Sequence, residues 1–351
     1  MKRTFICNIL PPEYIVKLKA SQAAINFCNR LVDGGCFDDV RSIVPVSYKL
    51  PKRIFYRNIT YYVNNGNNMV AKILRYVYLN MKLAWDVKRF DAVWFYNLTA
   101  SSLLSYIILK FLFMRRVYVI MADYTPPLRK KSMQTIIGGL LKRCNGMIAL
   151  SARSCFDQIK NLHIKAGIID EEMLNRSVEN VRSDKITFLF SGTLTPVTGY
   201  EMALKVFSQI PEAQLFVSGN GAFPDIYRKY ENIHFMGNLP YNDYLELLES
   251  VTVCLNFRNP NLPENNNNFP SKILDYFSRH KIVLSTMSYP EIEGANYIYS
   301  DFDESVLIKK VMDIVAMGVD NLTEYTNNTM FLRENFSVSS WKNMIRLVEK
   351  K

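Results

Sequence analysis

Residues 186–193, Ile-Thr-Phe-Leu-Phe-Ser-Gly-Thr, run from a continuously apolar segment into a glycine turn, and a helix-length pattern begins near Gly199. A short apolar run rich in β-branched and aromatic residues is typical of a strand buried on both faces of a parallel sheet. Glycine between strand and helix lets a ligand approach the backbone. The stretch therefore predicts a βα unit, whose turn is either a phosphate-binding loop or a plain tight turn.

Short apolar runs and helix-length patterns alternate on both sides of this unit. Strands are expected at residues 4–10, 42–45, 92–96, 117–121, 146–150, 186–190, 214–218, 233–236, 251–255, 282–285 and 297–299. Helices are expected at residues 21–32, 69–89, 101–112, 200–209, 241–249, 271–279 and 304–317, and one or two closing helices over 330–349. Such alternation predicts doubly wound α/β structure with parallel sheets.

The chain has 351 residues, about twice the usual domain length of roughly 150, so two domains are expected. The polar, acidic stretch from Asp170 to Asp184 has the composition of a linker. The prediction is a Rossmann-like domain over 1–170, a linker over 171–184, a second Rossmann-like domain over 185–330 and closing helices over 331–351. Two such domains would face a central cleft at the carboxyl edges of their sheets, where open α/β folds bind ligands.

The charge is divided unevenly between the two halves. The whole chain carries 43 basic and 32 acidic side chains, a net charge of +11. Residues 1–170 carry 26 basic and 9 acidic side chains, whereas residues 171–351 carry 17 basic and 23 acidic ones. A strongly basic half is compatible with three kinds of partner, namely nucleic acid, an anionic membrane or a phosphorylated substrate.

Two basic amphipathic patterns account for much of this positive charge. They are Lys72, Arg75, Lys82, Lys88 and Arg89 around Val70, Ile73, Val77, Met81 and Ala84, and the groups 129–131 and 142–143 around Ile136, Ile137, Leu140 and Leu141. Basic amphipathic helices are typical of contacts with anionic membranes. The alternative is that these cations lie on solvated outer helix faces.

The sequence predicts a cytoplasmic protein that is peripheral to the inner face of a membrane. The apolar run 5–10 is too short for a signal peptide and ends at Pro11-Pro12. The most apolar stretch, Leu98 to Met114, falls short of the ~20 residues that a spanning helix needs. The six cysteines form no Cys-x-x-Cys pair and have no histidine at ligand spacing, so we expect reduced thiols and no zinc site.

A second informative stretch is residues 268–276, Asn-Phe-Pro-Ser-Lys-Ile-Leu-Asp-Tyr. Pro270 and Ser271 are typical of a helix start, and Lys272 and Asp275 share one helix face at i,i+3. A cation beside a hydroxyl and free amides suits a diphosphate, and a carboxylate one turn deeper suits a ribose diol. The alternative is a surface helix with an ordinary Lys–Asp pair. The glycines at 219 and 221 do not indicate NAD binding, because the third glycine of that fingerprint is Pro224.

The back half resembles the donor-binding domain of GT-B glycosyltransferases, in particular the retaining group numbered family four. The matching segments are residues 190–194, 199–201, 215–221, 233–237, 251–258 and 269–276. The likeness is strong over 186–285 and weaker before residue 170. It implies that the domain over 185–330 binds the nucleotide sugar and that the domain over 1–170 binds the acceptor. Asn256-Phe257-Arg258, followed by Phe269-Pro270-Ser271-Lys272, is similar to the subset found in bacterial capsule, exopolysaccharide and O-antigen transferases.

The resemblance implies a donor site made of Gly192, Thr193, Gly219, Asn238, Leu239, Arg258, Ser271, Lys272 and Asp275. In it the diphosphate would meet Gly192, Ser271 and Lys272. Asp275 would take the ribose hydroxyls, and Asn238 and Leu239 would lie against the base. The sequence departs from the family at Thr193 and Thr198, where basic residues are common, and at Asn267, which stands for the partner of the acidic pair. His280 replaces a usual glycine, which is tolerable because His enters the left-handed region more readily than most residues.

Two residues are predicted to act in catalysis, and no metal is expected. Lys272 would stabilise the diphosphate leaving group as a fixed donor, as the metal-independent enzymes of this resemblance do. Asp123 follows the strand 117–121 and would serve as a general acid/base or orient the acceptor; the alternative is a turn or cap before Pro126-Pro127. Asp301-Phe302-Asp303 has the form of a metal-binding D-x-D motif, but its place before a helix favours capping.

The predicted function is transfer of a sugar, with retention, from a nucleoside-diphosphate sugar to a lipid-diphosphate-linked or oligosaccharide acceptor in surface polysaccharide synthesis. UDP is the favoured nucleotide, no cofactor is expected, and the basic domain would meet the anionic membrane surface. One alternative keeps the fold and makes the protein a nucleotide-sugar epimerase. Another is a non-enzymatic protein that binds anions or nucleic acid, although no helix-turn-helix, RNA-recognition or zinc signature is present.

Overall fold

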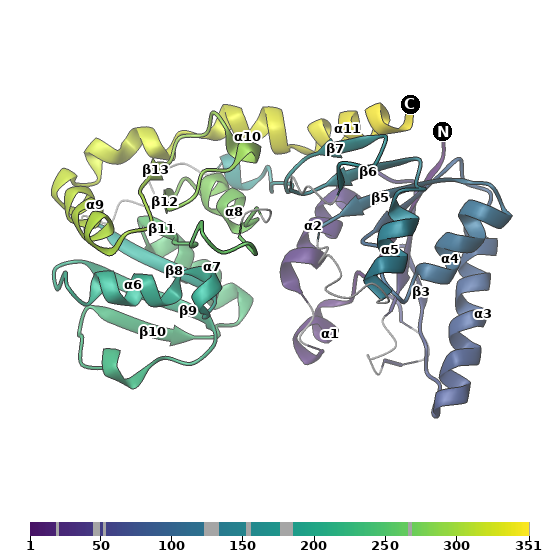
Figure 1. The fold of residues 1–351 in the computed structure, drawn as a ribbon, viewed down its shortest axis with the longest axis horizontal. Helices are drawn as coiled ribbons and strands as arrows, with labels where there is room; N and C mark the ends of the chain where they lie inside the picture. The colour runs from purple at the N-terminus through teal and green to yellow at the C-terminus, as the bar shows by residue number, and fades with distance from the viewer. Residues whose placement is uncertain are drawn as a thin grey trace. The chain divides into compact units, whose positions relative to one another are not determined.

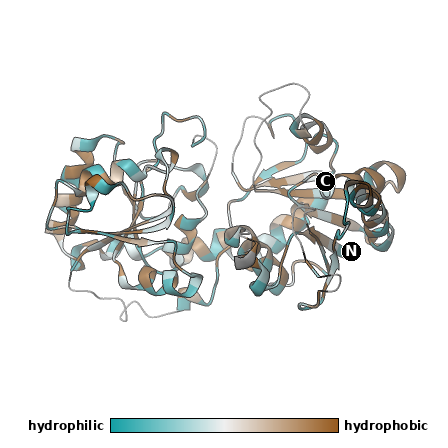
Figure 2. Cartoon of the chain, turned by 90° about the horizontal axis from the view of Figure 1, so that it is seen from below, coloured by the Kyte–Doolittle hydropathy of each residue, from teal (hydrophilic) through white to brown (hydrophobic). Residues whose placement is uncertain are grey.

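The structure is a computed structural model that describes residues 1–18, 21–44, 50–51, 54–122, 133–151, 156–175, 185–265 and 269–350. The chain forms two compact units (Figure 1), of which the first comprises Met1–Ile168 with Val338–Lys351 and the second comprises Ile169–Ser337. Each unit is built on one parallel sheet, and the helices around the sheets alternate between hydrophobic and hydrophilic residues (Figure 2).

The first unit contains a seven-stranded sheet in the order β3-β2-β1-β4-β5-β6-β7, and every neighbouring pair is parallel. The strands are β1 Arg3–Cys7, β2 Asp39–Ile43, β3 Ile59–Tyr62, β4 Ala92–Tyr96, β5 Arg116–Met121, β6 Gly146–Ala149 and β7 Leu162–Ile164. The chain order reverses between β1 and β4, as in doubly wound folds. Strand β4 is buried along its whole length because sheet neighbours and helices cover it on all sides.

The helices described in the first unit are α1 Pro12–Lys17, α2 Gln22–Asp33, α3 Met69–Val87, α4 Leu103–Ile107 with its π-helical continuation η1 Ile108–Leu112, α5 Met133–Leu141 and α11 Val338–Lys350. Two of them, α2 and α3, begin at polar residues whose side chains cap the helix. Ser21 accepts a hydrogen bond from the Ala24 amide at the start of α2, and Asn68 accepts one from Ala71 at the start of α3. These bonds satisfy amides that have no partner within the helix.

The closing helix α11 is an integral part of the first unit. Glu349 forms an ion pair with Arg3 over 2.8 Å and accepts a hydrogen bond from the indole of the buried Trp94 over 2.9 Å. Trp341 is fully buried and donates to the Gly167 carbonyl over 2.6 Å. Because these contacts join the last residues of the chain to its first strand, residues 331–351 do not act as one segment: α10 stays with the second unit and α11 with the first.

The second unit contains a six-stranded parallel sheet in the order β10-β9-β8-β11-β12-β13. The strands are β8 Thr187–Thr193, β9 Gln214–Asn220, β10 Ile233–Gly237, β11 Val253–Asn256, β12 Ile282–Ser285 and β13 Ile298–Tyr299. Numbered within the unit, this is the order 3-2-1-4-5-6 of dinucleotide-binding folds, with the reversal between β8 and β11. The predicted fold class, two doubly wound Rossmann-like domains, is therefore confirmed.

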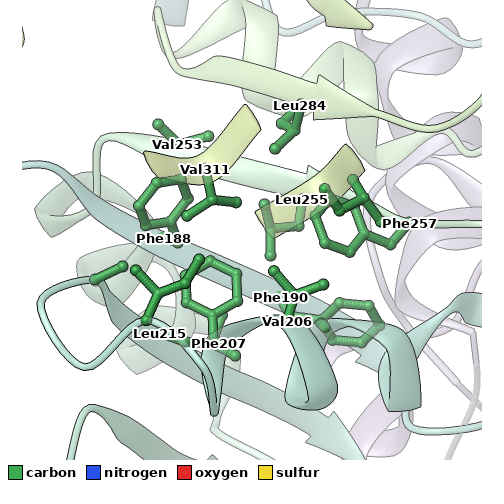
Figure 3. Close-up of a cluster of buried hydrophobic side chains, with 14 of the residues drawn as sticks. Phe188, Phe190, Val206, Phe207, Leu215, Val253, Leu255, Phe257, Leu284 and Val311 are labelled. Carbon is green, nitrogen blue, oxygen red and sulfur yellow. The ribbon is translucent and has the colours of Figure 1, made fainter. Parts of the chain in front are cut away.

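The helices of the second unit pack their apolar faces on this sheet. They are α6 Tyr200–Phe207, α7 Tyr241–Ser250, α8 Lys272–Ser278, α9 Glu304–Met317 and α10 Thr329–Phe336, with short turns η3 Met173–Asn175, η5 Pro196–Thr198, η6 Asp225–Tyr227, η7 Pro290–Ile292 and η8 Asp320–Thr326. Figure 3 shows the core, in which Phe188 and Leu255 from the strands meet Phe207 of α6 and Val311 of α9. This packed core fixes the strands whose ends carry the candidate site.

Several elements differ from the sequence expectation. Strands β3 and β7 and helix α1 were not expected, because their runs are short and carry polar residues. Helix α5 lies within the second basic amphipathic pattern, for which no helix bounds were predicted. Strands β8 and β9 continue beyond the apolar runs through Gly192 and Gly219, which pair with each other in the sheet. Of the predicted linker, residues 171–175 form a turn and η3, and residues 176–184 lie outside the described residues.

Candidate functional site

The candidate site lies at the carboxyl edge of the second sheet, where the strand order reverses. Strand β8 ends with Ser191, Gly192 and Thr193, and its neighbour β11 is followed by Phe257 and Arg258. In open α/β sheets the ends of the two strands that flank the reversal are where ligands bind. The residues predicted for the donor diphosphate are therefore placed at the expected edge.

Two glycines let strands β8 and β9 approach each other closely at this edge. Gly192 and Gly219 pair in register with φ angles of 146° and 154°, and a Cβ on Gly219 would lie 1.6 Å from the Gly192 carbonyl oxygen. Only glycine fits position 219 without moving the backbone of β8. A Cβ on Gly192 would lie 3.8 Å from the Lys272 ammonium nitrogen, so the bare backbone at 192 directly faces that cation.

The loop between β8 and α6 is locked onto the segment after β11. Gly199 has φ 77°, and a Cβ there would lie 1.5 Å from the Phe257 carbonyl oxygen. The turn η5 before it is closed by reciprocal hydrogen bonds between Thr195 and Thr198. Thr198, one of the positions where the resembling family has a basic residue, is thus used here to shape the loop.

Asn265 links the loop after β8 to the segment after β11 by side-chain hydrogen bonds. Its buried side-chain amide donates to the carbonyl oxygens of Val197, over 2.9 Å, and Asn259, over 3.0 Å. Its side-chain oxygen accepts a hydrogen bond from the Arg258 guanidinium over 3.4 Å. Because Asn265 satisfies groups on both loops, it fixes the position from which Arg258 reaches the sheet edge.

Lys272 contacts residues of strand β8 and helix α7 at the carboxyl edge of the sheet. Its ammonium donates to the Ser191 hydroxyl over 3.0 Å and lies 5.5 Å from the centre of the Tyr244 ring. The Ser191 hydroxyl also bonds Tyr276 over 2.8 Å and Tyr244 over 3.2 Å. A hydroxyl can donate one hydrogen bond and accept two, so these three partners saturate Ser191.

Lys272 is a partly desolvated cation. Burial lowers the pKa of Lys272 to about 8, Asp275 opposes that shift, and the nearby Arg258 adds to it. Burial also lowers the pKa of Arg258. The ion pairs of the second unit join Arg228 to Asp225 and Arg279 to Glu249, and among the described residues Lys272 forms none. A desolvated cation that is in no ion pair is stabilised further by binding an anion.

The predicted residues on α8 take different positions around this cation. Asp275 lies in the first turn and is half-buried, close enough to act on the charge of Lys272. Ser271 is exposed, has helical backbone angles and makes no capping hydrogen bond with its side chain. Ser271 therefore occupies the N-cap position at the predicted helix start, but its side chain does not cap the helix, and its hydroxyl stays at the surface beside Lys272.

The residues predicted to contact the base lie farther along the same edge. Asn238 and Leu239 directly follow β10, and Gly237 at its end pairs with Ser218 of β9, two strands away from Ser191. Asn238 is exposed and Leu239 is half-buried. The exposed Thr193 ends β8, and its carbonyl accepts a hydrogen bond from Thr198. The edge therefore presents Gly192, Gly219 and Lys272 together, and the positions predicted to contact the base lie at one side of them.

Two of the predicted positions cannot be placed. Asp123, the predicted acid/base, and Asn267, the counterpart of Asp275 in the family's acidic pair, lie outside the described residues. The D-x-D sequence is explained by Asp303, which caps α9 by accepting a hydrogen bond from the Val306 amide over 3.0 Å. Within the part of the chain that the structure describes, no three metal-ligating side chains are grouped.

Sequence reasoning missed the polar side chains that hold the site residues in place by hydrogen bonds. The cluster formed by Ser191, Tyr244 and Tyr276 depends on residues 85 positions apart, and no local pattern singles out Tyr244 on its helix. Asn256, buried at the end of β11, donates to Ser285 over 2.8 Å and to Tyr289 over 3.0 Å. Polar residues within apolar strands are the one signal that could have pointed to this network.

Solved structures match the chain over the length of both units. HepE from Anabaena, in a complex with UDP and glucose, matches with a TM-score of 0.70 at 14% identity over 100% of both chains. Sucrose-phosphate synthase from Thermosynechococcus elongatus matches with a TM-score of 0.70 at 10% identity over 100% of this chain and 98% of that one. The chain has the GT-B fold. No family model and no curated protein matches the sequence.

The GT-B fold is shared by more than one reaction class. A putative UDP-N-acetylglucosamine 2-epimerase from Listeria monocytogenes matches with a TM-score of 0.58 at 11% identity over 100% of this chain and 97% of that one. At such identities the likeness concerns the fold, and function has to be argued from the site.

Proposed function

We propose that the protein is a glycosyltransferase that binds a nucleoside-diphosphate sugar at the carboxyl edge of the second sheet. The observation that carries the proposal is the desolvated ammonium of Lys272, which faces the bare backbone of Gly192 at the strand reversal. A diphosphate there would accept hydrogen bonds from Lys272 and from the exposed hydroxyl of Ser271, while Arg258 adds positive potential.

In this proposal the protein's own groups stabilise the leaving group. As the bond to the sugar breaks, negative charge grows on the diphosphate, and Lys272 is already held in place by Ser191. A preorganised donor needs no reorganisation at the moment of reaction, which is the main way such charge lowers a barrier. Asp275, one turn deeper on α8, would accept hydrogen bonds from the ribose hydroxyls, and Asn238 and Leu239 would contact the base.

The acceptor and the stereochemistry are further parts of the proposal. We infer that the acceptor is lipid-diphosphate-linked or an oligosaccharide of a surface polysaccharide, that the configuration is retained as in the family-four group, and that the basic first half meets the membrane surface. The net charge of residues 1–170 supports this, because 26 basic and 9 acidic side chains favour an anionic lipid end. Among the described residues, none of the helices has both the length and the apolar character needed to cross a membrane.

The decisive experiment is a nucleotide-binding panel with matched lysine variants. Thermal shifts with UDP, GDP, CMP and dTDP, and with their sugars, would identify the base, since a ligand that binds only the folded state raises the melting temperature. Lys272→Ala should lose most of the shift, whereas Lys205→Ala, which removes an exposed lysine on α6, should keep it. If Lys272→Ala bound the nucleotides as well as the wild type and transferred sugar to membrane extract at the same rate, Lys272 would not bind the diphosphate.

The epimerase alternative is kept because a solved structure described as a putative UDP-N-acetylglucosamine 2-epimerase shares the fold over the whole chain. An epimerase would convert the sugar of its donor in the absence of any acceptor. Incubation of the protein with UDP-N-acetylglucosamine alone, followed by analysis of the sugar, distinguishes the two reactions. Conversion without acceptor would replace transfer by epimerisation and leave the nucleotide site unchanged.

A further inference from the structure

Helix α3 has two apolar faces, and within the described part of the first unit only one of them is packed against other elements. Leu79, Leu83 and Val87 are buried against the unit. Figure 1 shows α3 at the outer edge of this unit, beside α4. The second face is exposed and consists of Met69, Val70, Ile73, Leu74, Val77, Tyr78, Met81 and Trp85. An exposed apolar face of this extent marks an interaction site.

This exposed face continues onto the end of the neighbouring helix. Val70, Leu74, Val77, Met81 and Trp85 recur at i, i+4, i+7, i+11 and i+15, so they form one stripe along α3. At its C-terminal end, Trp85 contacts the ring of Phe113, with ring centroids 6.2 Å apart. The residues on either side of Phe113, namely Phe111, Leu112 and Met114, are exposed as well. We use the name α3 face for the exposed apolar side chains of helix α3 together with Phe111, Leu112 and Met114.

The α3 face is bordered almost entirely by positive charge. Residues 69–90 carry five basic side chains and one acid, and residues 108–116 carry three basic side chains and no acid. The acid, Asp86, is already bound to Lys82 and to the Tyr62 hydroxyl. An apolar stripe with cations along its edge is the composition of a helix that lies in a membrane interface and not across it.

We propose that the α3 face docks on an anionic lipid surface by inserting its apolar side chains between the head groups. Charge selects this occupant over a second copy of the chain, because a two-fold contact would bring two strongly basic surfaces together. Anionic phospholipids instead supply the complementary charge for Arg75, Arg89 and Arg115. The inference rests on the proposed function for the identity of a membrane-borne acceptor, and it adds the surface that brings the enzyme to it.

Trp85 supplies a direct measurement of insertion. The chain has three tryptophans, of which Trp94 and Trp341 are 0% exposed and Trp85 is 62% exposed. Vesicles of phosphatidylglycerol and phosphatidylcholine should therefore shift the emission of Trp85 to shorter wavelength, and lipids brominated in their acyl chains should quench it. Trp85→Phe should abolish both signals while cosedimentation with vesicles persists.

Matched variants separate the apolar and charged contributions. Leu74→Ser with Met81→Ser changes side chains that are 65% and 56% exposed, so folding should be preserved, and vesicle binding should weaken about tenfold or more. Ile226→Ser in the second unit changes a side chain that is 69% exposed and should have no effect. Arg89→Gln with Arg115→Gln should weaken binding about tenfold, and high salt should do the same.

Each outcome decides the proposal. Equal binding to vesicles of pure phosphatidylcholine would overturn the proposal that the α3 face requires anionic lipids. Absence of vesicle binding, together with a dimer in sedimentation that Leu74→Ser with Met81→Ser disperses, would assign the α3 face to a second copy. UDP binding, measured on the same proteins, tests the proposed nucleotide site separately from the lipid-docking surface. A chain that binds UDP but no vesicle loses only the docking surface, and a chain that binds vesicles but no nucleotide loses only the proposed function.

Discussion

The Lys272 ammonium donates to the Ser191 hydroxyl over 3.0 Å, although the two residues are 81 positions apart in the chain. This bond joins the helix that follows β11 to the end of β8, the two strands at the reversal of the sheet. Lysine has a long, flexible side chain, and a fixed acceptor is what gives its charge a defined position. The bond therefore converts a mobile cation into an oriented one at the place where a diphosphate would bind.

Ser191→Ala should weaken UDP binding by about three- to tenfold, the range expected for one hydrogen bond that positions a charge. The lost hydroxyl leaves Lys272 without its acceptor and the two tyrosines without their shared partner. Tyr244→Phe removes only one bond to Ser191 and keeps the ring, so its effect on affinity should be smaller. Isothermal titration with UDP checks both, and equal losses in the two variants would contradict a direct link from Ser191 to Lys272.

UDP affinity should fall as the pH rises through the lowered pKa of Lys272. In the free protein that pKa is about 8, and a bound diphosphate, being an anion, raises it. Binding above pH 8 therefore takes up a proton, and affinity should fall about tenfold between pH 7 and pH 9, since the phosphates are already ionised there. Titrations across this range measure the slope.

Lys272→Arg is the control for this pH dependence. Arginine stays charged over the whole range, so its slope should be close to zero even if its geometry lowers the affinity. A slope that persists in Lys272→Arg would assign the titration to another group, and a flat profile in the wild type would contradict a role for Lys272 in binding the diphosphate.

The glycines at the sheet edge allow a test of the geometry. In Gly219→Ala the new Cβ would meet the Gly192 carbonyl oxygen at 1.6 Å, so the end of β8 must move and UDP binding should be lost or weakened by more than tenfold. Gly237→Ala, at φ 67°, meets nothing within 4 Å and should cost only about 1 kcal/mol of stability for its backbone conformation. Melting temperatures with and without UDP distinguish the two effects, and equal loss of binding would point to a general weakening of the sheet.

The sequence predicted the layers of this fold because buried strands and amphipathic helices have clear periodicities. The limits of β4, β12 and α9 were predicted to the residue, since each is bounded by polar or turn residues. Strand β7, with the sequence Leu-His-Ile and no fully buried residue, has no such signal. Its place at the end of the sheet is a property of the tertiary structure alone.

The candidate site was predictable to the extent that it is local. Lys272 and Asp275 share a turn of one helix, so spacing was enough to link them. The saturation of Ser191 by Lys272, Tyr244 and Tyr276 is a long-range arrangement that spacing cannot reveal. The exposed α3 face was predicted as an amphipathic pattern, but only burial shows that its apolar stripe points away from the core.

His280 ends the helix that carries Lys272, and it does so in a conformation that glycine would adopt more easily. Its φ is 56°, its amide donates to the Phe277 carbonyl over 3.1 Å, and the Lys281 amide donates to the Tyr276 carbonyl over 3.0 Å. This is the hydrogen-bond pattern of a Schellman motif, whose left-handed position is usually glycine. The buried Nε2 of His280 also has no hydrogen-bond partner among the described residues.

His280→Gly should therefore raise the free energy of unfolding by about 0.5–1 kcal/mol, the relief of left-handed strain less the entropy that glycine loses on folding. His280→Ala is the matched control, because it removes the same imidazole but keeps a Cβ at positive φ, and it should be less stable than His280→Gly. Urea denaturation of the three proteins measures the difference. If the alanine variant proved as stable as the glycine variant, the gain would come from removing the unpaired imidazole, and the backbone strain at position 280 would contribute nothing.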